Sequence, residues 1–167
     1  MKRNQSLKLA PFFTAQAELD ADIHQKHDTN YQKNHRMRLL SFLVELGELA
    51  NATRCFKFWS LKGSESKEVV LDEYADALHF LLSLGLVNNH FLEQVEILPF
   101  SGDLTEGFLQ IYQACNRYEK ELTFAAYQAL FNAFFQIIPL LNAELSEVET
   151  AYFKKHEVNY QRQKNNY

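Results

Sequence analysis

Apolar residues recur along most of the chain at the three- and four-residue spacing of an α-helix, with polar residues between them. The strict alternation of a half-buried β-strand is not sustained, and only 5 Gly and 3 Pro interrupt the 167 residues. The pattern therefore predicts an all-α fold with an irregular segment at 87–103. The expected helices cover approximately residues 9–27, 33–53, 66–86, 104–118, 122–141 and 145–163.

Two of the expected helices each carry a pair of acids. Glu45 and Glu48 lie on one helix, Glu73 and Asp76 on the next, and the i, i+3 spacing puts both carboxylates of a pair on one face. Packed together, the two helices would bring four like charges close to one another, which requires a counter-charge. Mg²⁺ or Mn²⁺ suits carboxylate oxygens. Spacing alone leaves open that these are ordinary surface acids.

The segment 122–141 is the most apolar part of the chain, but Gln128, Asn132, Gln136 and Pro139 interrupt it. No uninterrupted apolar run approaches the length of a membrane span, so we expect no membrane association. A helix this apolar is expected to be buried centrally or at a subunit interface. It is therefore a candidate for dimer contact.

Composition narrows the class of protein. Hydrophobic residues make up 47% of the chain, enough for the core of one domain covering residues 1–167. The net charge of −4 argues against a nucleic-acid partner. Cys55 and Cys115 are the two cysteines and have no zinc-site spacing. With no signal-peptide pattern at the start of the chain, we expect a cytoplasmic protein.

Several residues outside the acid pairs have side chains suited to binding a ligand. Gln16 can both donate and accept hydrogen bonds, but could equally lie on a solvated flank. Trp59 offers a flat face for stacking on a base, and Lys57 could meet phosphate. The structural alternative is that the tryptophan fills the core and the lysine is solvated.

Further candidates lie beside Asp76 and near the C-terminus. His79 shares the helix stripe of Asp76, where a histidine is more often a structural hydrogen-bond partner than a ligand. Lys155, Asn159 and Arg162 follow one another at i, i+4 and i+7, so they share one helix face. The alternative is a basic tail that offsets the acidic remainder of the chain.

Together these motifs resemble the dimeric, all-α dUTPase family, a branch of the MazG-like nucleotide pyrophosphatases. The resemblance rests on ExxE followed by ExxD and on five separated patches that occur in the order of the family. The patches are Gln16–Ile23, Glu45–Asn51, Phe56–Ser60, Glu73–Gly85 and the Lys-x-x-x-Asn-x-x-Arg-Gln stretch at 155–163. The resemblance implies a helical bundle with the two acidic motifs on facing helices, and a homodimer.

The resemblance also implies an activity: Mg²⁺-dependent hydrolysis of dUTP, and of dUDP, to dUMP. In the family, the four acids hold two or three Mg²⁺ ions, and the position of Glu45 orients or deprotonates the attacking water. Two alternatives stay open. One is a MazG-like pyrophosphatase acting on dCTP or another nucleotide; the other is a helical interaction module whose acids are surface charge.

By the same resemblance, the substrate-binding residues divide between the parts of a deoxyuridine nucleotide. Gln16 and Asn159 would read the uracil. The Phe80 ring would crowd the place of a ribose 2′-hydroxyl. The remaining expected contacts are His79 to the deoxynucleoside, Trp59 to the base, and Lys57, Lys155 and Arg162 to the phosphates.

Overall fold

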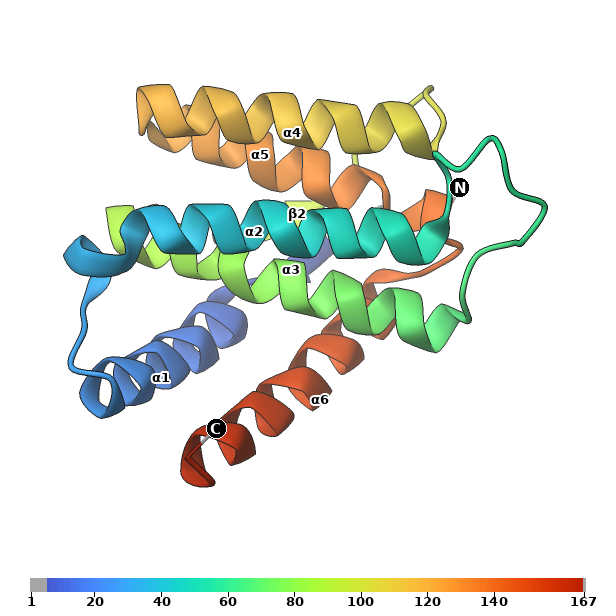
Figure 1. The fold of residues 1–167 in the computed structure, drawn as a ribbon. Helices are drawn as coiled ribbons and strands as arrows, with labels where there is room; N and C mark the ends of the chain where they lie inside the picture. The colour runs from blue at the N-terminus through green and yellow to red at the C-terminus, as the bar shows by residue number, and fades with distance from the viewer. Residues whose placement is uncertain (1–5, 167) are drawn as a thin grey trace.

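The computed structural model describes residues 6–166, and within them the all-α prediction is confirmed (Figure 1). The helices are α1 (Ala10–Lys26), α2 (Tyr31–Thr53), α3 (Lys67–Asn88), α4 (Leu104–Glu121), α5 (Phe124–Gln136) and α6 (Leu145–Lys164), with a short 3-10 helix η1 (Ile138–Leu141). Two three-residue strands, β1 (Ser6–Lys8) and β2 (Gln94–Glu96), pair antiparallel.

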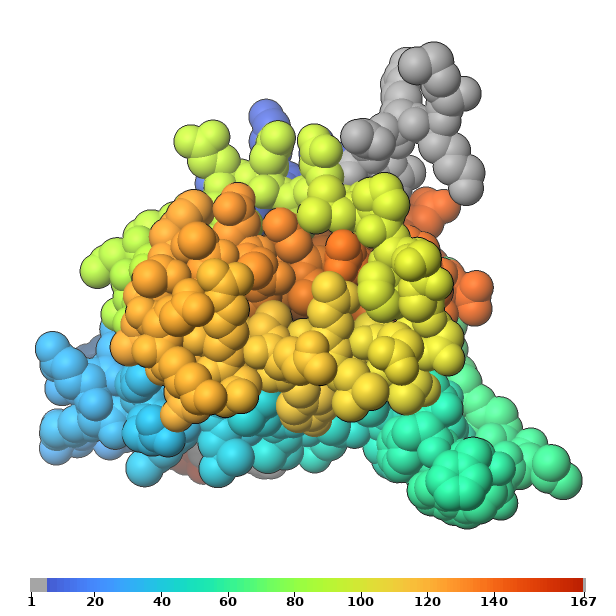
Figure 2. All heavy atoms as spheres, turned by 90° about the horizontal axis from the view of Figure 1, so that it is seen from above, coloured from blue at the N-terminus to red at the C-terminus, as the bar shows by residue number. Residues whose placement is uncertain are grey.

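Helices α2 and α3 form the centre of the arrangement and run antiparallel along each other (Figure 1). Helices α4 and α5 cover one side of this pair, and α1 and α6 cover the other. Figure 2 views the molecule from the α4–α5 side; the segment that joins α2 to α3 projects from one corner. The face of α3 opposite α5 is thus the face that meets α1 and α6.

The helix ends follow from residues that satisfy free backbone groups. Asn30, Ser66, Asp103 and Thr123 each precede a helix and accept a hydrogen bond from a backbone N–H of its first turn. In the capping box of α6, the carboxylate of Glu147 accepts from the backbone N–H of Glu144 at 3.0 Å. Arg54, Asn89 and Leu122 end α2, α3 and α4 with left-handed backbone conformations.

Three boundaries differ from the sequence prediction. The segment 87–103 is not wholly irregular, because β2 pairs with β1. The sequence has no sustained alternation of apolar and polar residues that would predict this pairing. Helix α4 continues three residues past Tyr118 to Glu121, so the chain reverses at Leu122. Helix α5 ends at Gln136, and Pro139 lies in the separate helix η1, because a proline lacks the N–H that a continuing helix needs.

Aromatic side chains join α3 to α5 in the core. The Tyr74 ring stacks on Phe134 with centroids 4.3 Å apart, and its hydroxyl donates to the Phe134 carbonyl at 3.1 Å. The Tyr127 hydroxyl donates to the Leu81 carbonyl at 2.8 Å. Because each buried hydroxyl is satisfied, these large rings contribute their apolar burial without an unpaired polar group.

The segment Phe124–Leu141 is the one stretch of the described chain that is long and apolar enough to cross a membrane, judged by length and composition only. In this structure 56% of it is buried inside the protein, as in a core helix. Its apolar side chains from Ala126 to Phe135 mostly pack within the chain. Of the two roles expected for this segment, central burial is the one the structure shows.

Gly85 provides a test of this packing. An alanine Cβ at this position would lie 2.5 Å from the Tyr127 hydroxyl oxygen and 2.6 Å from the His90 carbonyl oxygen. We expect Gly85→Ala to cost about 1–3 kcal/mol of folding free energy, as overpacking generally does, and to lower the melting temperature by several degrees. Gly63→Ala is the control, since its Cβ would meet nothing within 4 Å. Equal melting temperatures for both variants would contradict the close approach.

Candidate active site

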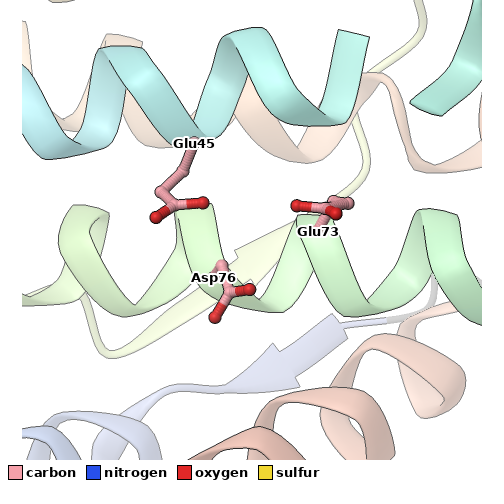
Figure 3. A group of neighbouring side chains, drawn as sticks. All are labelled: Glu45, Glu73 and Asp76. Carbon is pink, nitrogen blue, oxygen red and sulfur yellow. The ribbon is translucent and has the colours of Figure 1, made fainter. Parts of the chain in front are cut away.

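Three carboxylates from the two central helices form one cluster. Glu45 on α2 and Glu73 and Asp76 on α3 each offer an oxygen atom, and these oxygens lie within 4.8 Å of one another. Figure 3 shows Glu45 pointing from α2 toward α3, and the other two side chains arising from consecutive turns of α3. Glu48 is more exposed and lines the same cavity. The structure thus gathers three of the four predicted acids most tightly.

Ionisation of the clustered carboxyl groups is unfavourable. Burial, followed by the charges of Asp76, Glu48 and Glu73, raises the pKa of Glu45 to about 7. The pKa values of Glu73 and Asp76 are also raised, in each case mainly by burial. In its metal-free form the site therefore lacks positive charge, which a divalent cation bound to the carboxylates would supply.

Lys155 on α6 supplies part of the missing charge. Its Nζ lies 2.7 Å from a carboxylate oxygen of Asp72 and 2.7 Å from one of Asp76. Burial alone would lower the pKa of Lys155, but the two hydrogen bonds outweigh it and raise the pKa. The lysine therefore stays charged at the edge of the acid cluster, where it can meet an anionic group.

A cavity of about 470 Å³ opens over the acids, between α1, α2, α3 and α6. Most of the predicted site residues line it: Gln16, Glu45, Glu48, Glu73, Asp76, His79, Phe80, Lys155, Asn159 and Arg162. The remaining lining residues, which the sequence analysis did not assign to the site, are Leu19, Asp20, Ile23, Arg38, Asp72 and Gln163. Burial raises the pKa of Asp76 overall, but the charge of the exposed Arg162 is among those that oppose this rise, which places the arginine near the acids.

Lys57 and Trp59 do not line this cavity in the described residues. They lie in the segment between α2 and α3, where Trp59 is 65% and its neighbour Phe58 94% exposed. Trp59 is therefore not a core residue, which was its structural alternative. The two predicted roles in substrate binding stay predictions, and within one chain the structure does not bring these side chains to the acids.

A larger hollow of about 770 Å³ lies between the first turns of α3 and α6. Its charged side chains are already paired, Lys67 with Glu147 at 2.6 Å and Lys154 with Glu68 at 3.1 Å. It has no cluster of acids with raised pKa values. Its size alone does not make it the better candidate for chemistry.

Two polar side chains that line the same cavity are almost fully buried: Gln16 is 3% and His79 4% exposed. The His79 ring stacks on Tyr152 with centroids 4.4 Å apart, and its Nδ1 lies 2.7 Å from the Ala75 carbonyl oxygen. Since a carbonyl only accepts, Nδ1 carries the proton. Burial lowers the pKa of His79 to about 4, so the ring is neutral. Nε2 has no hydrogen-bond partner within the described chain and is an acceptor.

An all-α fold that presents paired acids and a lysine to one cavity is the class of structure that the sequence motifs indicate. The family model described as dUTPase matches residues 8–167, and the chain belongs to this all-α dUTPase family. No curated protein matches the chain. Membership makes the protein a dUTP pyrophosphohydrolase, an enzyme that acts on the acid anhydride of a deoxyuridine nucleotide. The family is typically metal-dependent.

The raised pKa of Glu45 predicts how stability depends on pH. Because the folded pKa of about 7 exceeds the ordinary 4.5, the folded protein holds this proton more tightly than the unfolded chain. The metal-free protein should therefore lose stability as the pH rises from 4.5 through about 7. We expect Glu45→Gln to raise the melting temperature at pH 8 in EDTA by a few degrees, and to change it little at pH 4.

The matched control for this measurement is Glu18→Gln, which neutralises an exposed glutamate of α1 outside the cavity. It should leave the melting temperature nearly unchanged at both pH values. A Glu45→Gln effect of the same size at pH 4 and pH 8 would show that the gain does not come from charge repulsion.

Proposed function

We propose that the protein is a Mg²⁺-dependent dUTP diphosphatase that converts dUTP to dUMP and pyrophosphate, and that also hydrolyses dUDP to dUMP. The observation that carries the proposal is the cluster of carboxylate oxygens from Glu45, Glu73 and Asp76, within 4.8 Å of one another, in the cavity of a dUTPase-family fold. Within the family, this cluster is where a phosphoanhydride and its metal would meet.

The donor set fits Mg²⁺. All three clustered donors are carboxylate oxygens, the hard ligands that Mg²⁺ and Mn²⁺ prefer, and Glu48 at the same cavity would complete a set for two or three ions. The raised pKa values of Glu45, Glu73 and Asp76 fit a site that is completed by cations. When bound, Mg²⁺ supplies charge neutralisation at the phosphates and lowers the pKa of the attacking water.

The protein's own groups would position the water and the phosphates. Glu45 would orient the attacking water or accept its proton, the role that the family resemblance implies for this position. The ammonium of Lys155 lies at the edge of the acids and would donate hydrogen bonds to phosphate oxygens, as would the Arg162 guanidinium. Cleavage of the linkage between the α- and β-phosphates then releases pyrophosphate.

The deoxynucleoside would occupy the end of the cavity away from the acids. Gln16 on α1 and Asn159 on α6 both line the cavity and carry amides that can pair with the uracil edge. Phe80 and His79 line it from α3. The Phe80 ring would pack against the sugar and disfavour a 2′-hydroxyl, while His79 Nε2 would accept a hydrogen bond from the nucleoside.

We also propose that the protein is a homodimer. Most of the apolar side chains of α5 pack inside the chain, and a second apolar surface is exposed on α2. Met37, Leu40 and Val44 follow one another along α2 at helical spacing and remain 69%, 62% and 49% exposed. Such a stripe of large apolar side chains is typical of a protein contact surface.

A dimer would also explain the exposed segment between α2 and α3. Phe58, Trp59 and Leu61 are all largely exposed to solvent, and Leu61 is wholly exposed. We propose that Lys57 and Trp59 reach the cavity of the partner chain, so that each site takes residues from both copies.

Localisation in the cytoplasm fits the two free cysteines, Cys55 and Cys115.

Assays against a panel of nucleotides test the substrate. We expect dUTP to be preferred over dCTP, dTTP and UTP by on the order of a hundredfold or more in kcat/KM, the range that polar sites reach when buried groups are left unpaired. Asn159→Ala should reduce this preference more than it reduces kcat. Glu73→Gln, the inactive reference, should abolish turnover and weaken Mg²⁺ binding while the circular dichroism spectrum stays helical. Equal hydrolysis of dCTP and dUTP by the unmodified protein would favour the MazG-like alternative.

Mixed dimers test whether the sites are shared. If Trp59 serves the partner's site, Glu73→Gln and Trp59→Ala each inactivate the homodimer, but a mixed dimer has one site with neither change. Co-expression of differently tagged chains should then restore about half of the activity per dimer. Mixed dimers without activity above the two parents, or a monomer in light scattering at micromolar concentration with full activity, would contradict the shared site.

A further inference from the structure

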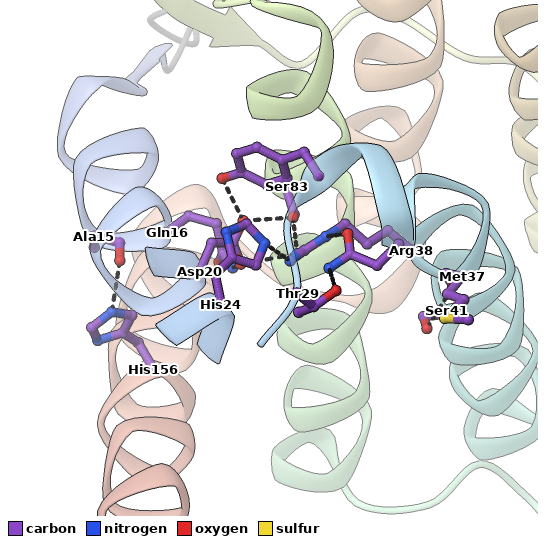
Figure 4. A network of polar contacts seen from close by, with 12 residues as sticks. Ala15, Gln16, Asp20, His24, Thr29, Met37, Arg38, Ser41, Ser83 and His156 are labelled. Atoms are coloured by element: carbon purple, nitrogen blue, oxygen red, sulfur yellow. Dashed lines mark hydrogen bonds and ion pairs between the residues drawn. The ribbon is translucent and has the colours of Figure 1, made fainter. Parts of the chain in front are cut away.

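A buried carboxylate forms part of the cavity wall. Asp20 is 1% exposed, and every contact that the structure gives its oxygens comes from a donor (Figure 4). Oδ1 accepts from Gln16 Nε2 and from Arg38 Nη1, each at 3.0 Å. Oδ2 accepts from the Tyr31 hydroxyl at 3.0 Å and from Ser83 Oγ at 2.6 Å. A side chain that faces these carboxylate oxygens therefore has to present a hydrogen-bond donor, not an acceptor.

This arrangement fixes the orientation of the Gln16 amide. Nε2 faces Asp20, and Oε1 accepts from the Tyr152 hydroxyl at 3.1 Å. If the amide were flipped, its oxygen would lie about 3 Å from a carboxylate oxygen and the bond to Asp20 would be lost. The N–H donor and the oxygen acceptor that Gln16 still has for a ligand therefore have fixed positions, in a fixed order along the amide.

The order matters because Gln16 lines the cavity. After the bonds to Asp20 and Tyr152, its amide retains one N–H donor and one lone pair on oxygen. Uracil presents a carbonyl acceptor at position 4 and an N–H donor at ring nitrogen 3, and cytosine reverses both. A freely rotating amide could match either base by flipping, whereas a fixed amide can match only one.

We propose that Asp20 is a positioning residue that fixes the hydrogen-bond polarity of the Gln16 amide and thereby makes the cavity select uracil over cytosine. The inference rests on the proposed function, in which Gln16 faces the base. The oxygens of Asp20 already accept hydrogen bonds from four protein donors, so its effect on selectivity comes through Gln16.

A second polar atom of fixed polarity lies at the same end of the cavity. His79 Nδ1 donates to the Ala75 carbonyl, so the buried and unpartnered Nε2 can only accept. Tyr152 contacts both groups, since it bonds Gln16 and stacks on His79. As proposed above, His79 Nε2 would accept a hydrogen bond from a donor of the nucleoside. The end of the cavity near Tyr152 thus holds two polar groups whose donor and acceptor positions are both set by the protein.

Asp20→Asn tests the proposal, because an asparagine amide can donate as well as accept and so allows Gln16 to flip. We expect the ratio of kcat/KM for dUTP to that for dCTP to fall about tenfold or more, mainly through faster dCTP hydrolysis. The kcat for dUTP should change only a few-fold, since the acid cluster is untouched. Tyr31→Phe is the matched control: it removes one hydrogen bond from Oδ2 but leaves Oδ1 facing Gln16, and should keep the ratio.

The Gln16→Ala variant distinguishes a failure of the proposed function from a failure of the positioning role of Asp20. If unmodified protein does not distinguish dUTP from dCTP, the proposed function fails. If it does distinguish them and Gln16→Ala loses the preference while a folded Asp20→Asn keeps it, the positioning role of Asp20 is overturned. Retention of the preference in Gln16→Ala would overturn it as well, because the amide would then not read the base.

A second measurement uses the unmodified protein, in case the loss of the Asp20 charge beside Arg38 prevents folding. Protein labelled with ¹⁵N-glutamine, with Gln16 assigned by comparison with Gln16→Ala, reports the side-chain amide by NMR. We expect two resolved Gln16 amide protons with slow solvent exchange, shifted by dUMP with Mg²⁺ but not by equal dCMP. Equal shifts with both nucleotides, or rapid exchange of both protons, would overturn a fixed amide.

Discussion

The cost of holding the carboxylates of α2 and α3 partly buried and close to one another is the constraint on which the rest of the structure depends. Burial first, and then the charges of Asp76, Glu48 and Glu73, raise the pKa of Glu45 to about 7. Burial of one large apolar side chain contributes about 1.5–3 kcal/mol. The opposite face of α3, where Tyr74 and Leu78 are fully buried, therefore offsets the cost of holding the acids together. Helices α4 and α5 provide no cavity residue and act through this packing.

The other two helices give the acids their chemical context. Helix α6 brings Lys155 between Asp72 and Asp76, and helix α1 brings the buried Gln16 to the same cavity. The cavity is thus lined by acids suited to cations and also by a neutral amide and a neutral imidazole whose polar atoms have fixed directions. In the proposed function, these two sets of side chains bind the two chemically different halves of a deoxyuridine nucleotide, the substrate class of the family.

Local patterns were sufficient to predict the helices and the acids, because both depend on spacing within one helix. The i, i+3 pairs needed only the packing of α2 on α3 to converge. Asp20 and Arg38 were missed as site residues although both were visible: one lies four residues after Gln16, the other on the stripe of Glu45. Their pairing at 3.0 Å joins α1 to α2 and depends on tertiary structure. The β1–β2 pairing was likewise non-local and too short to show alternation.

The position of α6 in the chain has a consequence for biosynthesis. The acids of α2 and α3 leave the ribosome before α4 and α5 do, while Lys155 and Asn159 follow only with α6. A nascent chain interrupted after α5 would carry the acidic cluster without the lysine that pairs with Asp72 and Asp76. On the roles proposed for Lys155 and Asn159, two of the nucleotide contacts would therefore form only when the last helix has been synthesised.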